Sequence, residues 1–243
     1  MNALKDHLFA LKQTLLFFIR GRFLVYFIPG VVIALLFLFY YQSFSSYSSY
    51  LDTLTHIPWA GSYIESGLTT VYSWVDGIAI FLYQFTIISL LSPFHTHLSE
   101  KVDTAQTGRV FKTGWEKVIN DIVRTLGVVI LGGLLYLSFK LMWMILAWIL
   151  GLSFLNPFVS ALLIGFFTGF NSYDYSLERH NISVYKSWKF GFKHPLHILI
   201  TGGFFSLLML MPFVGVIIAP VFLTVIGTIC FTRIQARSNQ NLE

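Results

Sequence analysis

Long apolar stretches alternate along this chain with short clusters of basic residues. One apolar span begins at Phe23 and ends at Tyr41, and a second runs from about residue 77 to residue 93. Two longer apolar regions follow, at 125–170 and 194–232. Because one crossing of a bilayer needs about 20 apolar residues, the pattern predicts two full transmembrane helices and two regions that each hold more than one helix.

The last apolar region predicts a hairpin. Residues 194–232 include no Asp, Glu, Lys or Arg, and a break at Met211-Pro212 lies near the middle. The region is too long for one span and barely long enough for two. Its second arm carries Gly215 and Pro220, and a proline inside a helix removes a hydrogen bond. We therefore expect interruptions in that arm and a helical hairpin that penetrates the bilayer only in part.

The region at 125–170 predicts a second hairpin of the same kind. Lys140 falls within its first apolar arm, and Gly151 and Asn156-Pro157 interrupt it further on. A lysine inside the membrane costs roughly 2.5–3.5 kcal/mol on insertion scales unless it snorkels or finds a partner. A partly penetrating hairpin reduces that cost. Four ordinary tilted helices are the alternative interpretation of the two apolar regions.

The basic clusters predict the topology. They precede the first span, separate the second span from the first hairpin, separate the two hairpins, and follow the last apolar region. The segment between the two full spans carries Asp52, Glu65 and Asp76 and no Lys or Arg. Since cytoplasmic loops are enriched in Lys and Arg, we expect this loop outside and both termini in the cytoplasm.

Composition agrees with a membrane protein that has one domain, residues 1–243. The chain is 56% hydrophobic and 11% charged, whereas soluble domains are about 25% charged. We find no nucleotide-binding glycine loop and no nucleophile elbow, so we expect no enzyme, no cofactor and no nucleic-acid partner. His95 and His97 are two residues apart and would not share a helical face, so we expect no metal site.

Amphipathic segments flank the predicted spans. Residues at spacings of three and four near the N-terminus form one apolar face: Leu4, Leu8, Leu11, Leu15 and Phe18. A similar pattern occurs at 115–122. Such helices lie flat at the headgroups, so we expect interfacial amphipathic helices beside the spans and hairpins of an all-α integral membrane protein.

The most suggestive polar group is Arg20-Gly21-Arg22, directly before the first span. A helix N-terminus offers free N–H groups and the positive end of the helix dipole. Two arginines and a flexible glycine beside it predict an anion-binding cradle. The alternative is that both arginines serve only the topology.

Other polar residues border the apolar segments and are candidates for a polar pathway or for structural roles: Glu100, Lys101, Lys140, Asp174 and Tyr175. Asp174 stands beside a long apolar segment with no other acidic residue between it and Asp121. We expect it to pair with Arg179 or Lys140, as a structural ion pair rather than as a transport residue.

Three blocks resemble the CysZ-type sulfate permeases of the etoposide-induced-protein family. The first is the basic turn at Arg20-Gly21-Arg22, ahead of a span with Pro29. The second runs from Ser92-Pro93-Phe94 to Asp103, although His95 replaces the family's usual Asn. The third runs from Ser160 to Tyr175 and is followed by the proline-broken tail.

The resemblance implies two transmembrane helices, two partly penetrating helical hairpins, and oligomers in the bacterial inner membrane that take up sulfate for cysteine synthesis. It also implies a sulfate site at Arg20, Gly21 and Arg22. We therefore expect an anion transporter or channel, with sulfate or a similar oxyanion and the lipid bilayer as partners. A non-transporting scaffold or bilayer-shaping protein of the same fold is the alternative.

Overall fold

The computed structural model describes residues 2–21, 23–32, 34–36, 38–39, 91–110, 115–211 and 214–240. All regular elements in this part of the chain are helical, as predicted. They are α1 (Asn2–Ile19), the 3-10 helix η1 (Leu24–Phe27), helical residues at 28–32, 34–36 and 38–39, a helix over 91–107, α4 (Trp115–Leu150), a 3-10 turn (Ser153–Leu155), α5 (Asn156–Arg179), α6 (Val184–Lys193), α7 (Pro195–Met209) and α8 (Val214–Gln240). Arg22 and Pro212 lie outside the described residues. The same holds for the loop before the second predicted span and for that span, at 77–93, except its last three residues.

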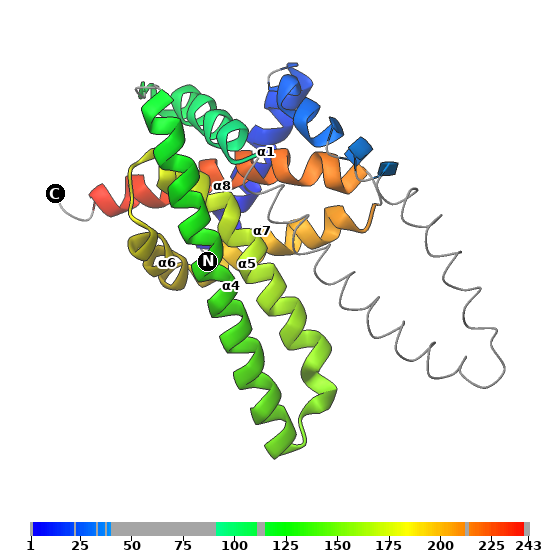
Figure 1. Cartoon of the computed structure of the whole chain (residues 1–243). Coiled ribbons are helices and arrows are strands. Elements are labelled where there is room, and N and C mark those ends of the chain that lie inside the picture. The colour runs from blue at the N-terminus through cyan, green and yellow to red at the C-terminus, as the bar shows by residue number, and fades with distance from the viewer. Residues whose placement is uncertain are drawn as a thin grey trace.

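The helices α4 and α5 form the first predicted hairpin, which projects as a long arm from the other helices (Figure 1). Gly151 adopts the left-handed conformation with φ 67° at the turn, which a glycine tolerates without strain. Both helices, over Val123–Leu150 and Ser153–Arg179, are long and apolar enough to cross a membrane. Only 11% and 17% of their most apolar windows are buried inside the protein, so the arm presents its apolar side chains outward.

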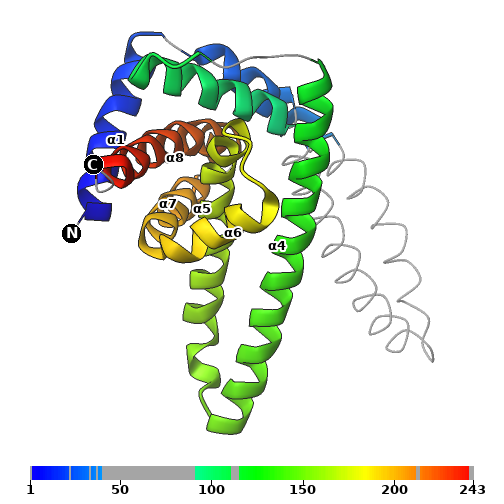
Figure 2. The ribbon, with the colours of Figure 1, turned by 90° about the vertical axis from the view of Figure 1, so that its left-hand side faces the viewer.

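The second predicted hairpin is formed by α7 and α8, which run side by side (Figure 2). A helix of 15 residues, the length of α7, rises about 22 Å, less than the roughly 30 Å of a hydrocarbon core. This length agrees with partial penetration, which stays a prediction. The expected interruption at Pro220 is wrong, because α8 begins at Val214, next to Gly215, and continues through Pro220.

The first helix, α1, has polar side chains on the side that faces the protein and exposed leucines on the opposite side. It buries Asp6, His7 and Thr14 against the rest of the protein, whereas Leu4 and Leu8 are each 59% exposed. Of the apolar face predicted from the sequence, Leu4, Leu8 and Leu15 therefore point away from the protein core, whereas Leu11 and Phe18 pack against it. Since exposed leucines are stable against lipid but costly in water, this orientation suits a helix that lies in the membrane interface.

Asp6 fixes α1 to the C-terminal hairpin. Its carboxylate accepts hydrogen bonds from Arg233 at 2.8 Å and from Arg237, both on α8, and lies 3.1 Å from His197 Nε2 on α7. Burial alone would raise the pKa of Asp6, but the hydrogen bonds from Arg237, Arg233 and His197 outweigh it and lower this pKa to about 2. The carboxylate is therefore ionised at neutral pH and holds three helices together.

The central contact of the fold is the crossing of α5 and α7, which glycines make possible. A Cβ added to Gly202 on α7 would lie 1.7 Å from the Gly165 carbonyl oxygen on α5. A Cβ added to Gly169 would lie 2.1 Å from the Ile198 carbonyl oxygen. Gly165 and Gly169 are four residues apart, the spacing of small residues that lets membrane helices approach closely.

We predict that Gly202→Ala destabilises the protein by about 1–3 kcal/mol or more, because the added methyl group must push two backbones apart. Gly203→Ala is the matched control, since nothing lies within 4 Å of a Cβ at that position. Unfolding of the purified protein in detergent would compare the two variants. Equal stability of Gly202→Ala and Gly203→Ala would contradict the close helix crossing.

Candidate functional site

The basic turn between α1 and η1 has the geometry of a sharp corner. The Gly21 N–H donates to the Phe18 carbonyl at 2.9 Å, and Gly21 has φ 70°. Arg20 is exposed, and its side chain has no hydrogen bond or ion pair within the described part of the chain. The turn therefore presents a free guanidinium next to the start of η1. The predicted third member of this site, Arg22, lies outside the described residues.

Glu100 and Lys101 lie on the 91–107 helix, near the start of the first membrane segment. Glu100 is buried, and its carboxylate lies 3.3 Å from His97 Nδ1. The His97 ring contacts the Tyr26 ring of η1 at 6.0 Å between centroids. Glu100 thus belongs to the helix that packs against η1, whereas Lys101 is exposed.

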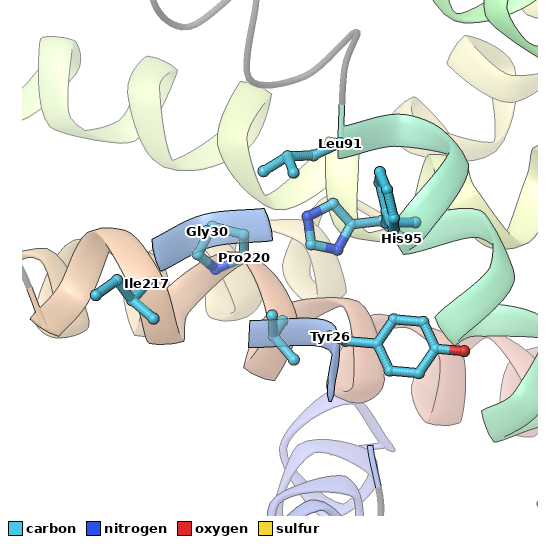
Figure 3. Close-up of a pocket in the computed structure, with 8 residues that line it drawn as sticks. Tyr26, Gly30, Leu91, His95, Ile217 and Pro220 are labelled. Carbon is cyan, nitrogen blue, oxygen red and sulfur yellow. The ribbon is translucent and has the colours of Figure 1, made fainter. Parts of the chain in front are cut away.

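A narrow crevice lies between three parts of the chain (Figure 3). They are η1 together with the helical residues directly after it, the 91–107 helix, and α8. The space between its walls amounts to about 210 Å³, open solvent included, but it is too narrow to hold a water molecule. Most of the lining is apolar: Tyr26, Gly30, Leu91, Phe94, His95, Ile217, Pro220 and Val221. In this conformation the crevice is closed.

His95 is the polar group of this crevice. The Thr224 hydroxyl donates to the Pro220 carbonyl at 2.7 Å, so its oxygen accepts from His95 Nδ1, which lies 3.2 Å away. His95 Nε2 is then an unprotonated acceptor, and this buried atom has no partner among the described residues. Burial lowers the pKa of His95 to about 4. Because His95 is therefore neutral, the crevice wall is uncharged at neutral pH. The Tyr175 ring stacks on the His95 ring at 5.1 Å between centroids.

Asp174 lies in a buried ion network and not where the sequence predicted. Both of its carboxylate oxygens accept from Arg124 on α4, at 2.8 and 3.1 Å. The expected pairing with Arg179 or Lys140 is wrong. Arg179 points instead to Asp103, and Lys140 lies farther along the arm. The network supports the structural interpretation of Asp174.

Glu178 extends this network toward the 91–107 helix. It accepts hydrogen bonds from Thr96 and Thr125, each at 2.7 Å, and lies 3.3 Å from Arg124. Arg124 also donates to Ser187 at 2.6 Å. Three helices, α4, α5 and α6, therefore meet around the Arg124 guanidinium, and the 91–107 helix joins them through Glu178.

A second ion pair lies beside the first. Arg179 and Asp103 are both fully buried, and their charged groups are 2.7 Å apart. Arg179 also donates to Ser99 at 2.7 Å, and Ser99 lies 2.8 Å from the Thr228 hydroxyl on α8. Buried charges are tolerated when they are paired and hydrogen-bonded, so this pair ties the 91–107 helix to α5 and α8.

Lys140 is exposed on the α4–α5 arm. Its ammonium group lies 5.7 Å from the centroid of the Tyr136 ring, one turn away on the same helix. No ion pair of Lys140 occurs within the part of the chain that the structure describes. The lysine is thus separate from the buried networks and from the basic turn.

The sequence pattern did not predict that Arg124, Glu178 and Asp103 belong to these networks. Asp174 and Glu178 are four residues apart and therefore share one face of a helix, which was an available signal. The partners of these two carboxylates could not be predicted from sequence spacing, because those partners lie on helices that are far away in the sequence. Within the described ranges, no group of three or more His, Cys, Asp or Glu could hold a metal ion.

A family model described as Sulfate transporter CysZ/Etoposide-induced protein 2.4 matches residues 10–220. The match covers the basic turn, the 91–107 helix, both arms of the first hairpin and α7. The chain belongs to this family. The comparison with curated proteins finds no match. Membership makes this a membrane protein of a sulfate-transporter-like family and confirms the resemblance noted in the sequence.

We predict that Arg124→Leu destabilises this CysZ-family protein by about 3–5 kcal/mol, because it leaves the buried carboxylates of Asp174 and Glu178 without their cation. Lys140→Leu, on the same helix, is the control and should change stability by less than about 1 kcal/mol. Unfolding in detergent would measure both. A similar loss in the two variants would show that the network contributes no more than an exposed lysine.

Proposed function

We propose that this protein moves a small oxyanion, most readily sulfate, across the bacterial inner membrane and so supplies cysteine synthesis. The observation that carries the proposal is the Arg20 guanidinium, which has no ion pair among the described residues, beside the left-handed Gly21 at the entry to the first membrane segment. The family match adds support, because it covers this turn. The protein would act as a channel or transporter without a cofactor, as a homo-oligomer.

The chemistry of the turn suits an anion with several oxygens. The first N–H groups of a helix have no partner within that helix and carry its positive dipole end. A guanidinium donates two parallel hydrogen bonds to a planar pair of oxygens. Sulfate offers such a pair and two negative charges. Arg20, Gly21 and Arg22 together would hold it at the membrane surface.

The crevice next to η1 supports a route inward from this turn. Its walls belong to three separate segments, and none of the residues that line it carries a charge at neutral pH. Since an anion needs more room than the present crevice gives, transport requires these segments to separate. Glu100 and Tyr175 would then border the path, whereas Asp174 and Arg124 would keep the cytoplasmic ends of the helices in place.

The second candidate function is a membrane scaffold or bilayer-shaping protein. The α4–α5 arm favours it, because that arm exposes apolar side chains along most of its length and has Lys140 as an isolated charge. Sulfate flux into liposomes, with chloride and phosphate as competitors, separates the two functions. A scaffold would show no flux above that of empty vesicles.

We predict that Arg22→Ala weakens sulfate binding by roughly 10- to 150-fold, since a hydrogen bond to a charged group contributes about 1.5–3 kcal/mol. Arg22→Lys should weaken it less than Arg22→Ala but more than Arg20→Lys, because lysine keeps the charge and loses the planar fork. Lys12→Gln removes an exposed charge from α1 and is the control.

Calorimetric titration of the purified variants with sodium sulfate would give these affinities. Parent-like binding by Arg22→Ala would place the site elsewhere. Loss of binding in Lys12→Gln as well would indicate a general effect of surface charge.

We also predict that both termini and α6 face the cytoplasm. In a variant without Cys230, a cysteine at Ser62 should react with an impermeant thiol reagent on intact cells, and one at the exposed Ser183 should not. Ser187 is a poor probe, because it is fully buried and accepts from Arg124. Labelling at position 183 alone would reverse the predicted orientation.

A further inference from the structure

The outer surface of α6 carries a stripe of three lysines. Lys186, Lys189 and Lys193 are separated by three and four residues, so they lie along one face of the helix. All three are exposed. None of them forms an ion pair with another residue in the described part of the chain. This stripe is a concentrated positive charge that the protein itself leaves unbalanced.

The surrounding sequence offers no acidic residue to balance it. No Asp or Glu occurs between Glu178 and Glu243, whereas Arg233 and Arg237 lie in the same stretch. Those two arginines bind Asp6 and are not available to add to the lysine face. Neither this stretch nor the ion pairs among the described residues supply a counter-charge for the lysines of α6.

An aromatic stripe runs beside the lysines on the same helix. Tyr185 is 75% exposed and Phe192 is 47% exposed. The two are seven residues apart, and Lys189 lies between them, four residues from one and three from the other. The exposed surface of α6 thus has an apolar side and a cationic side, as in helices that lie at the surface of an anionic membrane.

The packing of α6 places these stripes where the apolar arm begins. Trp188 stacks on Phe170 of α5 at 4.0 Å between centroids, and a Cβ at Gly132 of α4 would lie 2.7 Å from its ring. Phe192 contacts Phe166 at 5.4 Å. From Gly132 to Leu150, α4 continues for roughly 27 Å with mostly exposed apolar side chains.

If that arm lies in hydrocarbon, α6 lies across its base at the level of the lipid headgroups. We propose that the lysine stripe of α6 is a docking surface for anionic phospholipids, with Lys186, Lys189 and Lys193 binding headgroup phosphates and Tyr185 entering the interface. Lipid fits this surface better than a protein does, because the apolar stripe continues toward the membrane-embedded arm. The docking does not depend on sulfate transport.

The experiment measures preference for phosphatidylglycerol over phosphatidylcholine. The whole protein is reconstituted in phosphatidylcholine vesicles with dansyl-phosphatidylglycerol, and energy transfer from tryptophan is competed with unlabelled lipid. The test variant is Lys186→Gln/Lys189→Gln/Lys193→Gln. The control, Lys5→Gln/Lys12→Gln/Lys101→Gln, removes the same charge from other exposed positions. A triple Lys→Arg variant of α6 keeps the charge.

Each surface lysine strengthens anionic-lipid binding about fivefold, so the α6 triple Gln variant should lose up to roughly 100-fold of the preference at low salt. The Arg variant should keep it, and the control should lose less than the α6 variant, because its lysines lie on α1 and the 91–107 helix and do not form one stripe. Equal losses in the control, or no loss in the α6 variant, would overturn the proposal. A change in oligomer size with unchanged lipid preference would instead assign the surface to a second copy of the chain.

Discussion

The buried pairing of Arg124 with Asp174 and Glu178 is the interaction on which the rest of the structure depends. A charged residue within an apolar helix is stable only when it is paired and hydrogen-bonded. Asp174 and Glu178 lie at the inner end of α5 and are both buried. Their partners come from α4 and the 91–107 helix, so the pairing fixes the positions of helices that an apolar contact alone would leave free to slide.

Apolar length and charge distribution were enough to predict the helical class and the position of both helical pairs, and Gly151 was one of three interruptions expected in the first pair. These properties follow from the bilayer, which selects helices of a given length and places basic residues on one side. The continuity of α8 through Pro220 was not predictable in this way. Its most apolar window is 67% buried, and packing on several sides holds a helix together where one hydrogen bond is missing.

The candidate site was predictable only where its members are close in sequence. Gly21 forms a turn in the structure as expected, because a basic turn before an apolar span is a local feature. The partner of Asp174 was missed because ion pairing depends on which helices meet, and the choice between Arg179, Lys140 and Arg124 is made by tertiary packing. Arg179 pairs with Asp103 instead, and Lys140 lies on the α4–α5 arm, away from Asp174.

The orientation of α1 connects the basic turn to this interior. Because Asp6 is held by residues of α7 and α8, the helix α1 cannot rotate about its axis without exposing a buried carboxylate and breaking its hydrogen bonds. The turn that follows at Gly21 is therefore fixed in direction. The backbone at Arg20 is thereby placed beside the start of η1, and a binding group whose backbone is already positioned binds an anion at a lower entropic cost than one on a mobile segment.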